Sequence, residues 1–149
     1  MTHEECCNVI LWAPAIVDLA VRPTRRMGLP DLPFPVAHSR IETLAVQNNQ
    51  PYFFGLLDLP ALCSLKITTH LVSLYLSIEI CVPFLSRSRH LQKFSFDEPG
   101  IPLEIIRSMT QLTELALWNT PWWLEDDFFQ MLDPGYKSDT PPDLQAVVL

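Results

Sequence analysis

Cysteine and histidine are the residues of this chain whose types could support nucleophilic catalysis. The cysteines are Cys6, Cys7, Cys63 and Cys81, and the histidines are His3, His38, His70 and His90. A thiol beside an imidazole base can form a reactive thiolate. None of these residues stands in a recognisable nucleophile turn, and the sequence contains no Gly-rich phosphate loop or His-Glu-x-x-His motif. We therefore expect that the chain is not an enzyme, with a Cys/His-dependent hydrolase as the alternative.

The same side chains lack the spacing of a metal site. No Cys-x-x-Cys pair occurs, and adjacent Cys6 and Cys7 have poor geometry for a disulfide or a zinc site. The acidic run at 125–127 precedes an apolar helical pattern, where carboxylates are favoured by the helix dipole. We expect no metal and no cofactor, and we expect the thiols to be buried in a protein of a reducing compartment.

Charge and hydropathy restrict the partners. The chain of 149 residues has a formal net charge of −7, whereas nucleic acids and anionic membranes require a basic patch. The N-terminus, Met-Thr-His-Glu-Glu, is acidic and unlike a secretory signal. The longest apolar stretch, at 71–85, is interrupted by polar residues and is too short to span a bilayer. We expect a cytoplasmic or nuclear protein that binds neither nucleic acid nor a membrane.

A three-position apolar pattern recurs along the chain and predicts its strands. In residues 111–118 the apolar side chains occupy the second, fifth and seventh positions, and the same spacing occurs six times in all. The six sets are Ile16, Leu19 and Val21; Ile41, Leu44 and Val46; Leu62, Leu65 and Ile67; Leu91, Phe94 and Phe96; Leu112, Leu115 and Leu117; and Leu144, Val147 and Leu149. Successive sets are 25, 21, 29, 21 and 32 residues apart.

Leucine-rich repeats have periods of about 20–29 residues, so four of the five intervals fit and the last contains a small insertion. The intervals predict an irregular leucine-rich-repeat solenoid. We expect an α/β fold with about six repeats, a curved parallel sheet and helices on its convex side, in a single domain over 1–149. The Asn or Cys that usually stabilises the turn after each strand occurs here only at Asn49. Packing should therefore hold the turns more than a polar ladder does.

The covering segments are predicted from caps and prolines. Thr2 and Glu5 form a capping box for a helix to about residue 12, and 52–58 supplies a helical or 3₁₀ cover. Residues 71–80 are ambiguous; we expect an extended segment at 72–76 and a helix over 82–89 with Pro83 in its first turn. A further helix over 102–109 should bury Leu103, Ile106 and Met109.

Alternation along each strand predicts which side chains point away from the core. The first outward column is Asp18, Thr43, Ser64, Lys93 and Glu114; the second is Ala20, Ala45, Lys66, Ser95 and Ala116; the third is Arg22, Gln47, Thr68, Asp97 and Trp118. From these we predict a partner-binding concave face made by Arg22, Gln47, Lys66, Thr68, Lys93, Asp97, Glu114 and Trp118. Trp118 is the type of anchor that interface hot spots favour. Trp122 and Trp123 fit either a binding rim or a cap over the last repeat.

Segments 59–65 (LPALCSL), 84–94 (FLSRSRHLQKF) and 123–145 resemble fungal F-box/leucine-rich-repeat proteins. The resemblance implies repeats that recruit substrates to a cullin-RING ubiquitin ligase, with a separate F-box that binds the ligase adaptor. No F-box is visible at the N-terminus, and the nearest match, residues 101–106, occupies a repeat's helix position. We therefore expect a non-catalytic protein–protein interaction module that does not bind the adaptor.

The chain begins in a repeat's helix and stops in a strand, without the polar caps usual for solenoids. An unpaired sheet edge favours self-association. We therefore expect a fragment of a longer receptor or a non-functional truncated gene product, with marginal stability or self-association in isolation.

Overall fold

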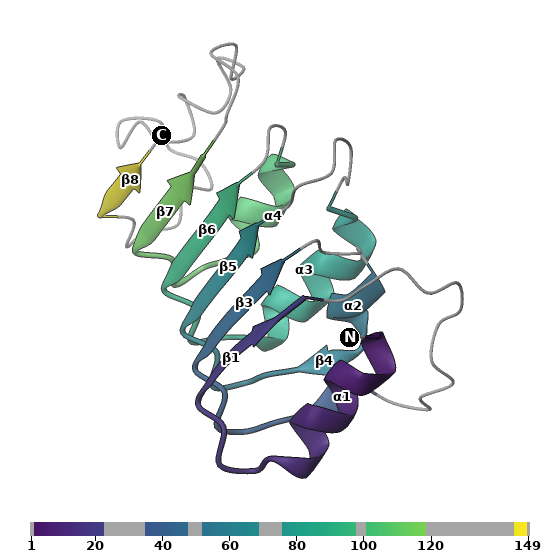
Figure 1. Ribbon diagram of the computed structural model, residues 1–149. Helices are drawn as coiled ribbons and strands as arrows, with labels where there is room; N and C mark the ends of the chain where they lie inside the picture. Colours follow the sequence, from purple (N-terminus) through teal and green to yellow (C-terminus); the bar gives the residue numbers. More distant parts are fainter. Residues whose placement is uncertain are drawn as a thin grey trace.

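Six of the described strands form the main sheet, which is parallel throughout. The structure is a computed structural model, and it describes residues 2–22, 35–47, 52–68, 76–97, 101–118 and 145–148. The strands are β1 (Asp18–Val21), β3 (Thr43–Gln47), β5 (Ser64–Thr68), β6 (Lys93–Asp97), β7 (Glu114–Leu117) and β8 (Ala146–Val148), which lie side by side in that order (Figure 1). The prediction of a parallel sheet built from these six segments is confirmed.

Equivalent residues of the predicted apolar pattern lie directly opposite each other on neighbouring strands. The central apolar residue of each set lies opposite that of the next: Leu19, Leu44, Leu65, Phe94, Leu115 and Val147. Within β1, β3, β5, β6 and β7 the inward positions are buried and the outward positions are not. The register follows because a slip of one residue would turn the apolar side of a strand to solvent.

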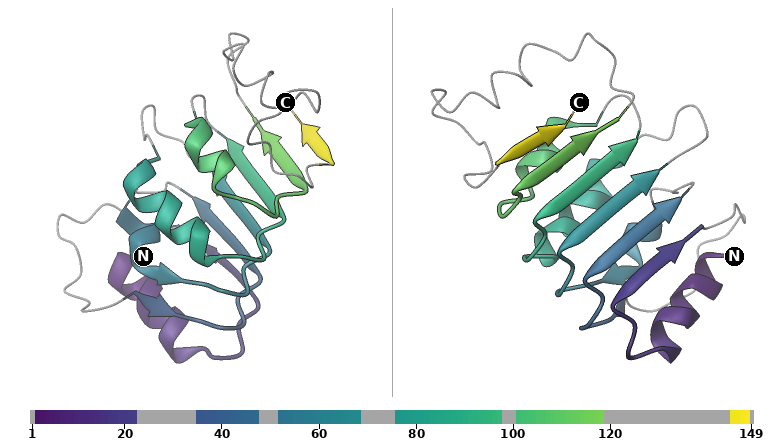
Figure 2. Two further views of the ribbon diagram at one scale, coloured as in Figure 1. Left: turned by 180° about the vertical axis from the view of Figure 1, so that it is seen from behind. Right: turned by 60° about the vertical axis from the view of Figure 1, so that its left-hand side comes forward.

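Among the described residues, four helices lie on one side of this sheet: α1 (His3–Trp12), α2 (Tyr52–Gly55), α3 (Ile78–Arg87) and α4 (Leu103–Arg107) (Figures 1 and 2). The capping box of α1 is confirmed. The Glu5 amide donates to Thr2 Oγ1 at 3.1 Å, and the Thr2 amide donates to Glu5 Oε2 at 2.7 Å. These two bonds satisfy backbone donors that the first helical turn leaves open.

A second, two-stranded sheet lies among the helices and was not predicted. Its strands are β2 (Val36–Ala37) and β4 (Leu57–Asp58), which are parallel to each other. The Val36 amide donates to the Leu56 carbonyl at 2.7 Å. The expected helical cover over 52–58 is therefore wrong in its last part, because the chain leaves α2 and pairs its backbone with β2.

The start of α3 differs from the prediction. The helix begins at Ile78, before the expected start at Val82, so Pro83 lies inside the helix and not in its first turn. Cys81 and Phe84 are buried three positions apart, which is the spacing of one helix face, whereas Ile78 and Pro83 are exposed. Burial of that face outweighs the hydrogen bond that proline cannot donate. The predicted extended segment at 72–76 falls almost wholly outside the described residues.

Helix α4 is shorter than predicted. Ile105 and Ile106 are fully buried and Met109 is buried beyond the helix end, while Leu103 is only partly buried. The expected face of Leu103, Ile106 and Met109 therefore points to the core, with Leu103 at its edge. Ile105 is buried as well and was not predicted.

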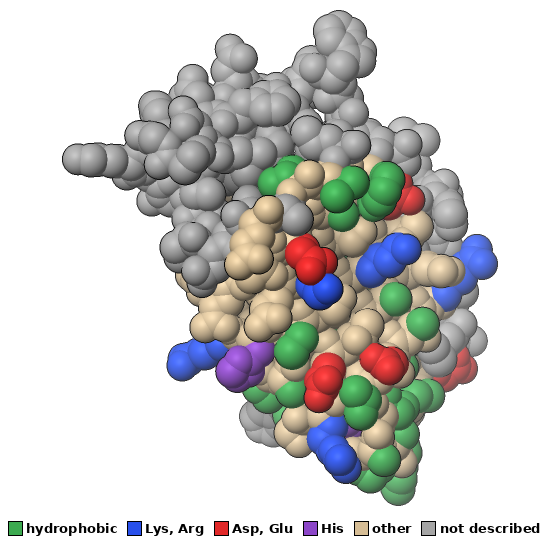
Figure 3. Space-filling view, turned by 90° about the vertical axis from the view of Figure 1, so that its left-hand side faces the viewer, with side chains coloured by type: hydrophobic (Ala, Val, Ile, Leu, Met, Phe, Trp, Pro, Cys, Tyr) green, Lys and Arg blue, Asp and Glu red, His purple; other side chains and the backbone are tan. Residues whose placement is uncertain are grey.

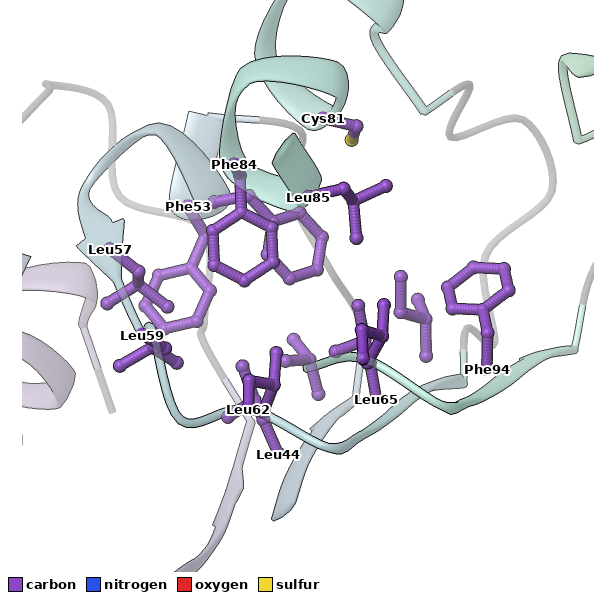
Figure 4. Packing of buried hydrophobic residues seen from close by; sticks show 14 of the residues in the cluster. Leu44, Phe53, Leu57, Leu59, Leu62, Leu65, Cys81, Phe84, Leu85 and Phe94 are labelled. Atoms are coloured by element: carbon purple, nitrogen blue, oxygen red, sulfur yellow. The ribbon is translucent and has the colours of Figure 1, made fainter. Parts of the chain in front are cut away.

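The apolar core fills the space between the sheet and the helices (Figure 4). Aromatic rings join α2 to α3: Phe54 stacks on Phe84 with ring centroids 5.1 Å apart, and Phe53 lies 6.2 Å from Phe54. Leu44 and Leu65 meet this layer from the sheet. No helix within the described parts of the chain is long and apolar enough to cross a membrane.

Candidate functional site

The face of the main sheet that points away from the helices carries the predicted site. We call it the open face. It comprises Asp18, Ala20, Arg22, Thr43, Ala45, Gln47, Ser64, Lys66, Thr68, Lys93, Ser95, Asp97, Glu114, Ala116 and Trp118, and none of these side chains is buried. Figure 3 shows acidic and basic side chains spread over this side of the molecule, with hydrophobic side chains between them. The alternation of the strands therefore brings all eight predicted site residues to one surface.

Register places the outward residues in continuous rows across the sheet. Lys93 lies directly opposite Glu114, and Lys93 Nζ is 2.9 Å from Glu114 Oε1. Both side chains are about half exposed, at 56% and 50%, so solvent screens this pair and it contributes little to folding. The pair instead fixes the position of two charges on the open face.

A depression of about 260 Å³ lies in the open face over β5, β6 and β7. Ser95 and Ala116 form part of its lining, and they are small residues in the middle row. Lys66, Lys93 and Glu114 also line it and carry longer side chains. The hollow forms because short side chains lie among long ones.

Val148 of β8 lines the same depression and was not among the predicted site residues. It is 46% exposed and lies opposite Ala116. The sequence pattern could have predicted it, because Val147 is an inward position and the next residue along a strand points to the opposite face.

Trp118 lies at the end of β7, where its amide donates to the Phe96 carbonyl at 2.9 Å. Its side chain is 48% exposed, although Leu117 before it is fully buried. A large indole held by a paired backbone and open to solvent is well placed to contact another molecule. Trp122 and Trp123, and the acidic run at 125–127, lie outside the described residues.

The buried thiols are poor nucleophiles. Burial raises the pKa of Cys6, Cys7 and Cys81 to about 11 each, so they are protonated at neutral pH. Cys63 is half-buried, and its thiol donates to the Ala61 carbonyl at 3.3 Å. All four cysteines are free.

His38 and His3 make contacts that stabilise the fold. His38 is buried, with Nε2 at 3.2 Å from the Ala13 carbonyl oxygen, and its Nδ1 accepts from the Arg40 amide at 3.3 Å. The His3 ring stacks on Phe53, and burial lowers the pKa of His3. Among the described residues no cysteine is hydrogen-bonded to a histidine, and no group of His, Cys, Asp and Glu could hold a metal ion.

The fold and this surface define an α/β protein with a parallel sheet whose one face is covered by helices and whose other face carries exposed side chains. No family model, curated protein or solved structure matches the chain. Its function must therefore be argued from the geometry of the open face.

Proposed function

We propose that the chain is an irregular leucine-rich-repeat-like solenoid of about six units and that the open face is its concave side. Six strands in matching register, separated by intervals of 21 to 32 residues, support a repeated strand-and-cover unit. The position of α2, α3 and α4 on one side of the sheet supports it as well (Figure 2).

The function that this architecture supports best is non-catalytic binding of a protein partner through the open face. The observation that carries this proposal is the depression in the open face. Its small lining residues are Ser95 and Ala116, and its charged lining residues are Lys66, Lys93 and Glu114. A partner can approach the backbone closely there and still meet fixed charges. Trp118 supplies an aromatic anchor near the end of the same surface.

A protein partner fits the charge of this face better than nucleic acid does. The positively charged residues of the open face include Arg22, Lys66 and Lys93. The negatively charged ones include Asp18, Asp97 and Glu114. Such a mixture complements a mixed protein surface but repels and attracts phosphates in equal measure.

The resemblance to F-box/leucine-rich-repeat proteins makes substrate recruitment to a ubiquitin ligase the biological role that we propose for this binding. The ligase adaptor is not expected to bind, because residues 103–106 of the nearest F-box-like sequence contribute to α4, where Ile105 and Ile106 are buried in the core. Four free cysteines support a cytoplasmic or nuclear location, where thiols stay reduced.

Site-specific photo-crosslinking in cells tests which face binds. A crosslinking amino acid replaces Lys66 on the open face in one variant, and Glu104 on the exposed side of α4 in the matched control. We expect protein adducts from position 66 that are missing from position 104. Adducts that are the same at both positions would remove the open face from the proposal.

Trp118→Ala in the Lys66 crosslinking variant then measures the anchor. Truncation of an aromatic hot spot costs about 2 kcal/mol of binding energy, which is about 30-fold in Kd. We expect the position-66 adducts to fall accordingly. Trp12→Ala is the control, because Trp12 is an exposed tryptophan on α1 and should leave these adducts unchanged.

A further inference from the structure

Within the described residues, β1 is the outermost strand of the main sheet on one side. Among the described strands β1 pairs only with β3, and the Thr43 amide donates to the Val17 carbonyl at 3.1 Å. In a parallel ladder alternate residues direct both their backbone groups to the same neighbour. Val17, Leu19 and Val21 therefore face β3, which leaves the N–H and C=O of Asp18 and Ala20 directed to the free edge. Arg22 follows directly after the last residue of the strand.

The sequence of this edge is complementary to itself when reversed. If a second copy lies antiparallel with Ala20 opposite Ala20, then Asp18 of each copy lies opposite Arg22 of the other. Asp18 and Ala20 have edge-facing backbone, so Ala20 and its copy form the central hydrogen-bonded pair of an antiparallel ladder, with Asp18 and Arg22 opposite each other on both sides of it. Opposite charges across strands are stabilising, and the exposed alanine leaves the centre of the junction free of a bulky side chain.

We propose that two copies of this chain join through β1 into one continuous sheet, with a two-fold axis at Ala20. The axis runs perpendicular to the sheet, so both open faces lie on the same side and stay uncovered. The binding function proposed above neither requires this dimer nor is blocked by it.

Apolar surface at the same end of the molecule supports a second copy as the occupant. Figure 2 shows α1 at the β1 end of the sheet, on the helix side. Val9, Leu11 and Trp12 of α1 are 39%, 53% and 84% exposed. The two-fold axis brings both copies of α1 to one side of the junction, where these side chains can lose contact with water.

Charge reversal provides the test, with the full chain in sedimentation-velocity ultracentrifugation. Asp18→Arg puts arginine opposite Arg22 of the other copy, and Arg22→Asp puts aspartate opposite Asp18. Residues 18 and 22 lie about 13 Å apart along one strand, so they do not pair within a chain. We expect each single variant to weaken the wild-type dimer by about tenfold or more, because two like-charge pairs replace two opposite pairs.

Mixing the two variants in equal amounts should restore the dimer, because every junction pair in the mixed dimer again has opposite charges. Glu104→Arg and Arg107→Asp on α4 are matched controls with the same changes in net charge, and they should dimerise as the wild type does. Circular dichroism checks that each variant is folded. A monomeric wild type, assemblies that keep growing beyond a dimer, or a mixture that stays monomeric would each overturn the proposal.

Discussion

Burial determines the chemistry of individual side chains in this protein. Cys6, Cys7 and Cys81 lie in the core, where burial raises each pKa to about 11, whereas Cys63 is half-buried. We expect a short pulse of iodoacetamide at neutral pH to modify Cys63 first and the three buried thiols only after unfolding. Peptide mass spectrometry measures the order.

The same labelling experiment tests the hydrolase alternative. A catalytic thiol reacts in the folded protein because a neighbouring base keeps it as thiolate. Fast labelling of one buried cysteine in the folded chain, lost when a histidine is replaced, would contradict the non-catalytic proposal. Labelling that follows exposure alone would support it.

We expect the burial of His3 to make the folded protein less stable at mildly acidic pH than at neutral pH. Its ring stacks on Phe53 with centroids 5.6 Å apart, and burial lowers its pKa below the ordinary 6.5. The unfolded chain therefore binds a proton at higher pH than the folded chain does, so the free energy of unfolding falls as pH drops through 6.5. Urea titrations at a series of pH values measure this dependence.

His3→Phe should remove that part of the acid-side loss, because phenylalanine fills the same stack without titrating. His90→Phe, at an exposed position on the same chain, is the matched control and should keep the loss. If both variants show the wild-type dependence of stability on pH, the protonation of His3 does not contribute to it.

Helix α3 shows how one element depends on its buried face. Phe84 is 1% exposed and stacks on Phe54 of α2. Removal of a buried phenylalanine ring costs about 3–5 kcal/mol through lost burial and the cavity left behind. We expect Phe84→Ala to lower the free energy of unfolding by that amount in urea titration.

Ile78→Ala is the matched control within α3. Ile78 is 42% exposed at the first residue of the helix, so its truncation should cost less than about 0.5 kcal/mol. Equal losses for Phe84→Ala and Ile78→Ala would contradict the assignment of the buried face.

Long strands can be predicted from the sequence, whereas short ones cannot, because an alternating pattern needs several residues to be recognised. β3 and β5 alternate over five residues each, so their inward and outward sides follow from the pattern alone. β2 and β4 have two residues each, which is too short for any period. Before α3, the alternation of Val72, Leu74, Leu76 and Ile78 in the sequence favours a strand. Only the burial of Cys81 and Phe84 in the tertiary structure accounts for a helix that starts at Ile78.

At the scale of the whole molecule, the open face was predictable because it needs only alternation and the order of the strands. Lys93 and Glu114 occupy the same predicted column, and the structure pairs them at 2.9 Å. The depression beside them was not predictable, because it depends on the lengths of side chains from neighbouring strands and on Val148 of β8. The dimer edge likewise required the hydrogen-bond direction of β1, which the register with β3 supplies.

The offset-free register also indicates where this protein can change during evolution. The partner positions Asp18, Thr43, Ser64, Lys93 and Glu114 are aligned, although the chain between them varies from 21 to 29 residues. Gains and losses of residues are thus absorbed between strands without disturbing the sheet. A single deletion within β5, by contrast, would exchange the inside and outside of everything that follows it in that strand. We expect lineages of this chain to differ in connection length long before they differ in strand length.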